Sequence, residues 1–518
     1  MRTTKSIKLA GIQGVPVIIE CSMSKGVGIH VVGLADSAVR DSLLRTVTAI
    51  QSKGFVFPGK KVIINLAPAD LCKTGTGYDL PIALSLIAES HQDKENLNDL
   101  EEWMTVGELG LDGSVREVPG CIQAVREAIE MGCKGVVIPA ANGPEVASVF
   151  GRIIPVYGVS SLDEAIAAIG GMGTVPTVWE VQSSSQAHRV RPQRAWDQLV
   201  GNIAGKRAIE IAAAGGHPLL LMGAPGSGRT TLARALRELL PPMDIDETLE
   251  VASIYSASGR GETRTFTNET HTRPFRSPHY SASLAALFGG GNGDSVQPGE
   301  LSLASKGILY IDEVNLLPRA VSEALHSVLR ERKLVISRLR SKVVFPADIQ
   351  FVGAMNPCPC GYYGEGDRCN CSQRERELWL ASFKEKAVYQ SFDIQAWVHP
   401  VSGQESVSAG KVETESVEVV AQRVRQARER QARRYAGDVG IRLNVDLKAA
   451  DTDVYCHLDD ECLALLDKIT ERLGLSCDVR LPVIRLARTI ADLADEDNIK
   501  PEHLCEAASY RFLDRETH

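Results

Sequence analysis

Residues Gly223–Thr231 read GAPGSGRTT and have the glycine spacing of a loop that binds the phosphates of a nucleotide. Such glycines let successive backbone N–H groups surround a phosphate, and the helix that follows points its positive end at it. The hydroxyl of Thr230 is then a candidate ligand for Mg²⁺. The alternative is a glycine-rich turn that binds nothing. The candidate phosphate-binding residues are Gly223, Ala224, Pro225, Gly226, Ser227, Gly228, Arg229, Thr230 and Thr231.

Arg229 departs from this pattern, because a phosphate-binding loop usually carries lysine at that position. Arginine keeps the positive charge, but its planar guanidinium is bulkier than a compact ammonium. We therefore expect nucleotide binding to survive the change better than hydrolysis. Since Arg229 would face the phosphates, it remains a candidate catalytic residue.

Two acids and an amide follow later apolar runs. The run GILYI (307–311) ends in Asp312 and Glu313, and FVGAM (351–355) ends in Asn356. Asp312 is a candidate Mg²⁺ ligand, directly or through water, and Glu313 is a candidate base for the attacking water. Asn356 can reach the γ-phosphate or orient that water. A strand that ends in solvated acids is the alternative, but the upstream loop favours a site for ATP and Mg²⁺.

Four cysteines form a second cluster, with the spacing C-x-C-x8-C-x-C. Four thiolates in two close pairs across a glycine-rich loop suit tetrahedral Zn²⁺, and no ligand position is left for a substrate. We therefore predict a structural metal. Four free thiols are the alternative, and a cytoplasmic disulfide pair is disfavoured. The candidate ligands are Cys358, Cys360, Cys369 and Cys371.

Apolar runs and helical patterns outline the elements that must position these side chains. In residues 1–170 the pattern predicts strands at 14–24, 28–34, 60–68 and 135–140 and helices at 80–90 and 121–132, which indicates an α/β domain. Residues 171–194 are predicted to be a linker. Residues 195–402 show strand–loop–helix order and further buried strands, typical of an α/β domain with a parallel sheet. For the C-terminal part, residues 403–518, we predict helices at 416–437, 459–474, 480–495 and 500–513. A loop at 402–415 is predicted to lead into them.

The bulk properties limit the class of protein. With 518 residues, 44% hydrophobic residues and a net charge of −8, the chain is expected to form several globular domains without an overall basic coat. It has no apolar run of about 18 residues and no signal-peptide pattern at its start, so we expect a cytoplasmic protein without a membrane span.

Several longer stretches together resemble the magnesium-chelatase-like AAA+ family of the ComM/YifB type. They are RAIEIAAAGGHPLLLMGAPGSGRTTLARAL (207–236), FRSPHYSASLAALFGGG (275–291), PGELSLASKGILYIDEV (298–314), NPCPCGYYGEG (356–366) and ARTIADLA (487–494).

The resemblance covers essentially the whole chain. It implies a Lon-protease-like N-terminal domain, a three-layer P-loop ATPase domain and a C-terminal helical lid. It further implies a hexameric ring and an ATP-driven helicase that migrates DNA branches in natural transformation, with adenine contacts near Val200 and Gly201.

The chain departs from the family at several functional positions. Ser391 stands at the position of the arginine finger and Asp478 at that of the lid arginine. Gly77 and Gln123 replace the serine and lysine of a Lon-type dyad, so we expect no peptidase activity. Candidate substitutes for the missing arginines are Lys384, Lys386, Arg480, Arg485 and Arg488.

Two basic segments are candidates for DNA contact. One combines Arg273, Arg276, His279 and Tyr280, and an interface between subunits is an equally favoured alternative. The other is a predicted hairpin over 330–342, for which a solvated surface is the alternative. Its basic residues are Arg330, Arg332, Lys333, Arg338, Arg340 and Lys342. Beside a DNA motor, the sequence leaves open a hydrolysis-poor nucleotide-dependent scaffold and, with less support, a metal-chelatase motor subunit.

Overall fold

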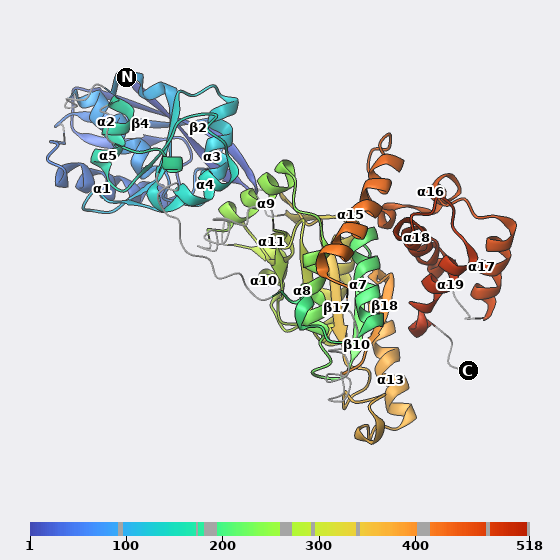
Figure 1. Ribbon diagram of the computed structural model, residues 1–518. Coiled ribbons are helices and arrows are strands. Elements are labelled where there is room, and N and C mark those ends of the chain that lie inside the picture. Colours follow the sequence, from blue (N-terminus) through green and yellow to red (C-terminus); the bar gives the residue numbers. More distant parts are fainter. Residues whose placement is uncertain are drawn as a thin grey trace.

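The computed structural model describes residues 1–57, 59–91, 97–171, 175–180, 194–259, 272–291, 296–337, 342–400, 415–472 and 477–514. Most of the predicted linker at 171–194 and of the predicted loop at 402–415 lies outside these ranges. The elements form an elongated molecule, with an N-terminal α/β part at one end, a second α/β part in the middle and helices at the other end (Figure 1). Among the described helices, none combines the length and the apolar character needed to cross a membrane.

A mixed sheet of seven strands forms the centre of the N-terminal part, in the order β3-β4-β2-β1-β5-β8-β9. The predicted strands in this part are present, whereas β1, which runs antiparallel to β2, and the short strands β5 and β9 were not predicted. The strands are β1 (Arg2–Ala10), β2 (Gln13–Ser24), β3 (Gly28–Val32), β4 (Lys61–Ala67), β5 (Trp103–Thr105), β8 (Gly135–Pro139) and β9 (Val156–Val159). The helices are α1 (Ser37–Ser52), α2 (Asp79–Ser90), α3 (Cys121–Glu130), α4 (Gly143–Val149) and α5 (Leu162–Gly170).

The central sheet is parallel throughout, in the order β11-β14-β17-β10-β18. All carboxyl ends of its strands therefore lie at one edge. Its strands are β10 (Leu219–Gly223), β11 (Phe275–Arg276), β14 (Ile308–Ile311), β17 (Gln350–Met355) and β18 (Ile394–Val398).

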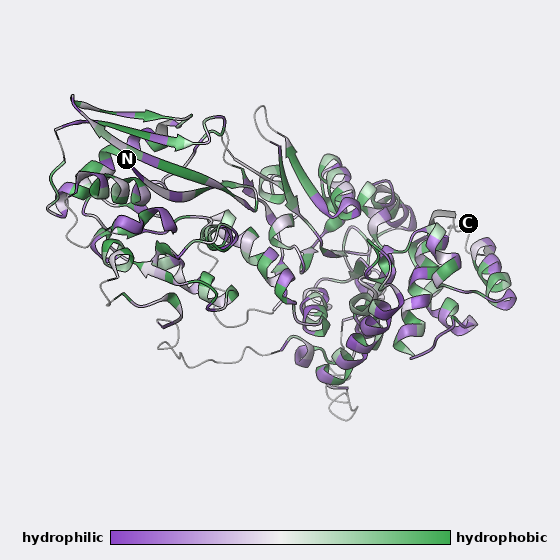
Figure 2. Ribbon diagram, turned by 90° about the horizontal axis from the view of Figure 1, so that it is seen from above, coloured by the Kyte–Doolittle hydropathy of each residue, from purple (hydrophilic) through white to green (hydrophobic). Residues whose placement is uncertain are grey.

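Alternate residues of these strands face two separate cores. Leu219 and Leu221 pack with α7 (Ile203–Gly215) and α8 (Arg229–Leu239), whereas Leu220 and Met222 pack on the opposite face with α12 (Arg319–Glu331). The continuous apolar runs of the sequence reflect this burial on both faces. Figure 2 shows the resulting pattern, with hydrophobic strands and helices that carry both colours. The predicted α/β fold with three layers is therefore present.

Short elements are inserted between the central strands. They are α9 (Ile245–Ser258), α10 (Leu284–Phe288), α11 (Glu300–Leu303), the pair β12 (Gly289–Gly290) and β13 (Gln297–Pro298), the hairpin β15 (Lys333–Ser337) and β16 (Lys342–Pro346), and α13 (Gln373–Lys384). The predicted basic hairpin is thus present but begins later than expected. Arg330 belongs to α12, and Arg332 is the C-cap of that helix.

Helices alone form the C-terminal part: α15 (Val417–Arg434), α16 (Ala449–Tyr455), α17 (Asp460–Arg472), α18 (Cys477–Leu493) and α19 (Pro501–Ser509). Buried side chains of α15 and α18 share one core with α7. A buried hydrogen-bond network adds to this contact. The ring of His217 lies 2.8 Å from Asp393 Oδ2 on one side and 2.8 Å from Thr489 Oγ1 of α18 on the other.

A close seam joins the N-terminal and central parts. The backbone N–H of Gly120 donates to the Ser256 carbonyl at 3.1 Å, and the side chain of Gln123 donates to the Ser253 carbonyl at 2.7 Å. The turn between β1 and β2 also reaches the central part, because a Cβ on Gly11 would lie 2.7 Å from Val343 Cγ1 of β16. We call the contact of α3, α4 and this turn with α9 and β16 the seam.

Candidate nucleotide site

The loop after β10 is shaped as a phosphate cradle. Gly226 and Gly228 have φ values of 80° and 94°, which glycine adopts without strain. A Cβ at Gly223 would clash with the Val398 carbonyl oxygen, so this position also needs glycine. Helix α8 begins at Arg229 without a side-chain cap, and its first backbone N–H groups are not capped by the protein. Ser227 Oγ is buried and has no hydrogen-bond partner among the described residues. The loop fits a phosphate group.

The predicted polar side chains meet beside this loop at the carboxyl edge of the sheet. Arg229 Nη1 donates to Asn356 Oδ1 at 3.1 Å, and Arg229 Nη2 lies 3.7 Å from Asp312 Oδ1. Asn356 Nδ2 donates to Glu313 Oε1 at 3.5 Å. Parallel strands bring them together, because β14 and β17 are neighbours and end at the same edge. The arrangement joins a cation, an amide and two carboxylates around the phosphate cradle.

Arg229 lies deep in this arrangement. Its side chain is only 8% exposed, whereas that of Asp312 is 48% exposed. The guanidinium therefore lies on the carboxylate that was predicted to hold Mg²⁺ and on the side-chain amide of Asn356. We call this amide the sensor amide, because it was predicted to reach the γ-phosphate or orient the attacking water. A lysine in its place has one donor centre and cannot span both groups in the same way.

Two further features surround the acids. Glu313 has a φ of 51°, a left-handed conformation that is unusual for a residue other than glycine and often marks a functional position. The hydroxyls of Thr230 and Tyr310 lie 3.1 Å apart. Tyr310 was not predicted as a site residue, since within an apolar strand it reads as core, and only its position next to Thr230 shows a polar role.

The predicted adenine-contact segment lies at the start of α7. Gly201 and Asn202 both have left-handed φ values, of 64° and 53°. They turn the chain into α7, where a Cβ on Gly205 would lie 3.0 Å from Leu232 of α8. Val200 is 38% exposed beside them. Val200 and Gly201 thus lie at the start of α7, a helix that packs through Gly205 on the helix that follows the cradle.

The predicted substitutes for the missing arginines have other contacts in the described structure. Lys386 Nζ donates to the Asn315 and Leu317 carbonyls at 2.5 and 2.6 Å, and burial lowers its pKa. Ser391 Oγ lies 2.8 Å from His326 Nδ1, and Lys384 is exposed.

The lid arginines are engaged within the C-terminal part. Arg480 pairs with Asp467 at 2.7 Å, Arg485 donates to the Leu447 carbonyl, and Arg488 donates to the Glu496 and Asp497 carbonyls. The side chain of Asp478 lies outside the described part. None of these three arginines contacts the cradle within this chain.

The four cysteines form one cluster, with all Sγ atoms within 4.8 Å of one another. Cys358 Sγ lies 3.4 Å from Cys360 Sγ and 3.8 Å from Cys369 Sγ. Tetrahedral Zn²⁺ with Zn–S bonds of about 2.3 Å requires sulfur separations of about 3.8 Å. The donor set and its spacing therefore fit a closed metal site, which was predicted from Cys358, Cys360, Cys369 and Cys371.

The basic segments differ in whether their charged side chains form ion pairs with acidic residues. Arg273 pairs with Glu247 and Arg276 with Glu300, at 2.8 and 2.7 Å, so both arginines support the local fold. Arg332 pairs with Asp348 and Asp446. Lys333 and Lys342 are exposed on the hairpin, whereas Arg338 and Arg340 lie outside the described residues.

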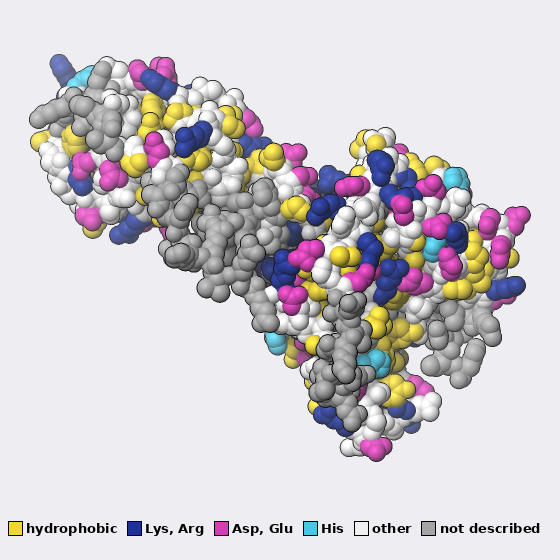
Figure 3. All heavy atoms as spheres, viewed as in Figure 1, with side chains coloured by type: hydrophobic (Ala, Val, Ile, Leu, Met, Phe, Trp, Pro, Cys, Tyr) yellow, Lys and Arg dark blue, Asp and Glu magenta, His cyan; other side chains and the backbone are white. Residues whose placement is uncertain are grey.

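His279 is exposed and its ring centroid lies 4.3 Å from that of Tyr280. Figure 3 shows positive and negative side chains interspersed over the face that it presents.

Comparisons with known proteins cover most of the chain. The family described as "Magnesium chelatase, subunit ChlI" matches residues 195–406, "Subunit ChlI of Mg-chelatase" matches 19–142, and "Magnesium chelatase, subunit ChlI C-terminal" matches 414–511. The uncharacterized protein YifB of Escherichia coli is 38% identical over 98% of this chain and 96% of its own length.

The competence protein ComM of Haemophilus influenzae is 35% identical over the same shares of the two chains. The magnesium-chelatase 38 kDa subunit of Chlorobaculum tepidum is 31% identical, but only over 27% of this chain and 40% of its own.

Proposed function

The chain belongs to the magnesium-chelatase-like AAA+ family of the ComM/YifB type, and from this membership we propose that it is an ATP-driven ring motor that acts on branched or single-stranded DNA. One observation carries the proposal. Arg229, Asp312, Glu313 and Asn356 lie together beside a glycine cradle at the carboxyl edge of a parallel sheet. Open α/β sheets bind their ligands at this edge.

Each residue has a role that its contacts support. The amides of the loop hold the phosphates of ATP, and Thr230 and Asp312 hold Mg²⁺. That metal would neutralise charge on the phosphates. Glu313 orients and polarises the attacking water, and Asn356, which contacts both Glu313 and Arg229, fixes that geometry.

The remaining parts of the proposal concern assembly and partners. We propose a hexameric ring in which neighbouring subunits supply the cations that this chain does not bring to its own cradle. The exposed Lys333 and Lys342 of the β15–β16 hairpin are the proposed DNA contacts. Zn²⁺ on the cysteine cluster is proposed as structural. No peptidase activity is proposed, because Gln123 is 1% exposed and bonded across the seam. We propose the domain boundaries predicted from the sequence, with residues 175–180 assigned to the N-terminal part, on which Val178 packs.

The test combines binding, turnover and assembly. Calorimetry on metal-replete protein should show ATP and ADP binding, and phosphate release should rise when forked DNA is added. Glu313→Gln should bind ATP as the wild type does and release no phosphate. Failure to bind either nucleotide at millimolar concentration would contradict the whole proposal.

A second function has one observation in its favour. Arg229 bridges Asn356 and Asp312, and this contact can hold the site in a form that binds nucleotide without hydrolysing it. The protein would then be a nucleotide-dependent scaffold around DNA. Assembly upon ATP addition without phosphate release, measured by analytical ultracentrifugation, would select this function. A metal-chelatase motor has less support, since the likeness to the Chlorobaculum tepidum subunit covers only 27% of the chain.

A further inference from the structure

The cysteine cluster begins two residues after Asn356. β17 ends at Met355, Asn356 follows, and Cys358 is fully buried at the start of the loop that carries the other three cysteines. We call residues 358–371 the cysteine loop. A short and buried connection of this kind leaves little freedom between the loop and the sensor amide.

The cysteine loop also touches the phosphate cradle. Gly361 has a φ of 86°, and a Cβ there would lie 3.0 Å from Cδ of Pro225 and 3.7 Å from Cγ of Asn356. The backbone of the loop therefore packs between the cradle and the sensor residue. Any refolding of the loop changes the surroundings of both.

The helix that follows the loop holds Asn356 from its other side. α13 starts directly after Cys371, with Ser372 and Glu375 forming a capping box. One turn later, Trp379 Nε1 donates to the backbone carbonyl of Asn356 at 3.0 Å. Arg376 stacks on Tyr363 of the loop, with 4.4 Å from its guanidinium carbon to the ring centroid. Helix and loop thus form one unit around Asn356.

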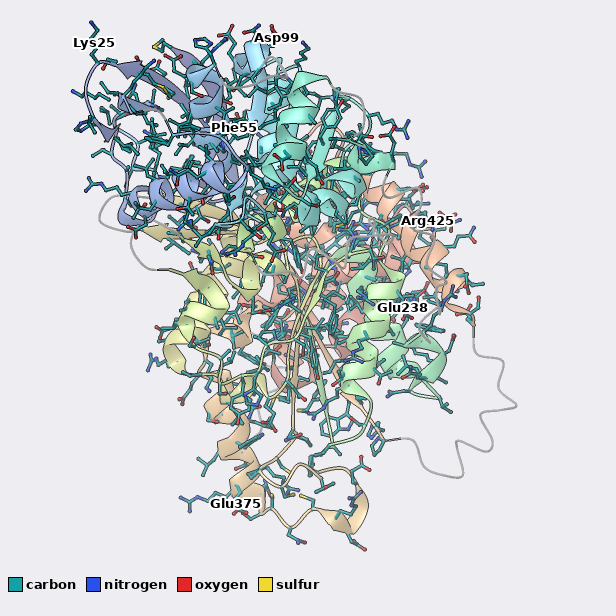
Figure 4. All side chains as sticks on the ribbon, turned by 90° about the vertical axis from the view of Figure 1, so that its left-hand side faces the viewer. Lys25, Phe55, Asp99, Glu238, Glu375 and Arg425 are labelled. Carbon is teal, nitrogen blue, oxygen red and sulfur yellow. The ribbon has the colours of Figure 1, made fainter. Side chains whose placement is uncertain are left out.

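This unit lies far from the N-terminal part. In Figure 4 the labelled Glu375 lies at the opposite end of the molecule from Lys25, which follows β2. The seam therefore does not support the cysteine loop, whose shape rests on local contacts such as that of Tyr363 with Arg376 and on the cysteine cluster itself.

We propose that the metal-bound cysteine loop and Trp379 are a positioning device for Asn356, so that metal loading controls the rate of ATP hydrolysis more than the affinity for nucleotide. This inference rests on the proposed ATPase. The backbone amides of the cradle belong to α8 and its loop, which the cysteine loop touches through Gly361 at the side chain of Pro225. Asn356, in contrast, is held by the loop and by Trp379 directly. Trp379 is thus a positioning residue that acts through Asn356.

The experiment compares full-length wild type, Trp379→Phe and Leu378→Ala. Phenylalanine keeps an aromatic ring but has no N–H donor, and Leu378 is an exposed neighbour on the same helix. Because one hydrogen bond is lost, we expect kcat of Trp379→Phe to fall about three- to tenfold, with KM for ATP and Kd for ADP changing less than about twofold. Leu378→Ala should match the wild type.

The second arm removes the metal from wild-type protein with a chelator, checked by elemental analysis, and measures hydrogen exchange, ADP binding and phosphate release. The backbone amides of residues 352–356 should exchange faster without metal, and re-addition of Zn²⁺ should restore their protection. Equal exchange with and without metal would overturn the inference. A proportional loss of ADP binding and kcat in both arms would also overturn it, because the loop would then support the fold alone.

The two proposals fail in different ways. If the wild type binds ADP but releases no phosphate, the proposed ATPase fails, and the exchange arm still decides whether the metal positions Asn356. If phosphate is released normally by metal-free protein and by Trp379→Phe, the ATPase stands and the positioning role is refuted.

Discussion

Arg229 is the residue on which the rate of the proposed reaction depends most directly. Its guanidinium joins the sensor amide to the predicted magnesium ligand and is almost completely buried. Motor activity requires these groups to separate when the phosphates of ATP bind. The energetic cost of that separation is specific to arginine, since lysine has a single donor centre.

We expect Arg229→Lys to raise steady-state phosphate release by about three- to tenfold, which corresponds to roughly 1 kcal/mol of barrier. The ammonium fits between the β- and γ-phosphates and frees Asp312 for Mg²⁺. Arg234→Lys is the matched control, because Arg234 is exposed on the same helix α8. Lower turnover of Arg229→Lys at saturating ATP would show instead that the guanidinium is the working cation.

The sequence predicted the residues that motifs define locally. Thr230, Asp312, Glu313 and Asn356 each follow an apolar strand, and the parallel sheet brings those strand ends together. Tyr310 and Trp379 were missed for a physical reason. Their polar atoms meet Thr230 and Asn356 across space, with no spacing rule that links the pairs.

At the scale of elements, strands were predicted correctly where both of their faces are buried. β10, β14 and β17 have apolar residues on both faces and were found from the sequence. β1 was missed because Thr4 and Ser6 are buried polar residues within it, which breaks the expected alternation. Residues 175–180, predicted as linker, instead pack on the N-terminal part, where Val178 is 4% exposed.

The seam contains a buried acid whose titration should loosen it. Glu145 of α4 accepts hydrogen bonds from Asn142 at 3.0 Å and Ser256 at 3.4 Å, and burial raises its pKa to about 7. Glu117 adds to this rise. Because the folded pKa lies above the unfolded one, the stabilisation is present below about pH 4.5 and is lost as pH rises through 7.

We therefore expect the seam to be weaker at pH 8 than at pH 5, by up to about 3 kcal/mol. Glu145→Gln should flatten this dependence, because the amide stays neutral. The measurement is the opening free energy of α3 and α9 amides from hydrogen exchange, corrected for intrinsic rates. Glu117→Gln, which removes a smaller contribution to the raised pKa of Glu145, should reduce the pH dependence by less than Glu145→Gln does. An unchanged pH dependence in Glu145→Gln would assign the effect to other groups.

The buried hydrogen bonds of His217 should stabilise the packing of the C-terminal helices on the central part. Thr489→Val removes the hydroxyl that meets His217 and Asn444, so we expect a loss of about 1–3 kcal/mol in unfolding free energy. Urea denaturation followed by circular dichroism measures the change. Thr470→Val serves for comparison, because its hydroxyl bonds only within α17. Equal losses of unfolding free energy in the two variants would mean that the hydrogen bonds of His217 do not stabilise this packing.

On the scale of the whole molecule, a net charge of −8 argues against a general attraction to DNA, so the proposed binding requires a local basic contact. The exposed lysines of the β15–β16 hairpin are the proposed contact, whereas Arg273 and Arg276 are held by glutamates. Basic residues thus have two roles, which composition alone did not separate.

Replacing Lys333 and Lys342 together by alanine should weaken binding to single-stranded DNA of any base sequence. It should also reduce the steepness of log K plotted against log salt concentration by about 1.4, or about 0.7 for each contact. Fluorescence anisotropy at several salt concentrations measures both quantities. Arg319→Ala removes an 86% exposed cation from α12 and should leave the slope unchanged. A slope that stays constant in the double variant would place the DNA contact elsewhere.

The turn between β1 and β2 gives the hairpin a second property. Gly11 lies against Val343 of β16, and Ile12 enters the apolar cores beneath the hairpin and beside α9. The seven-stranded sheet is therefore packed, through this turn, on the base of the hairpin that carries Lys333 and Lys342. If the hairpin moves, we expect the sheet to move with it, because the turn between β1 and β2 belongs to the packing of both.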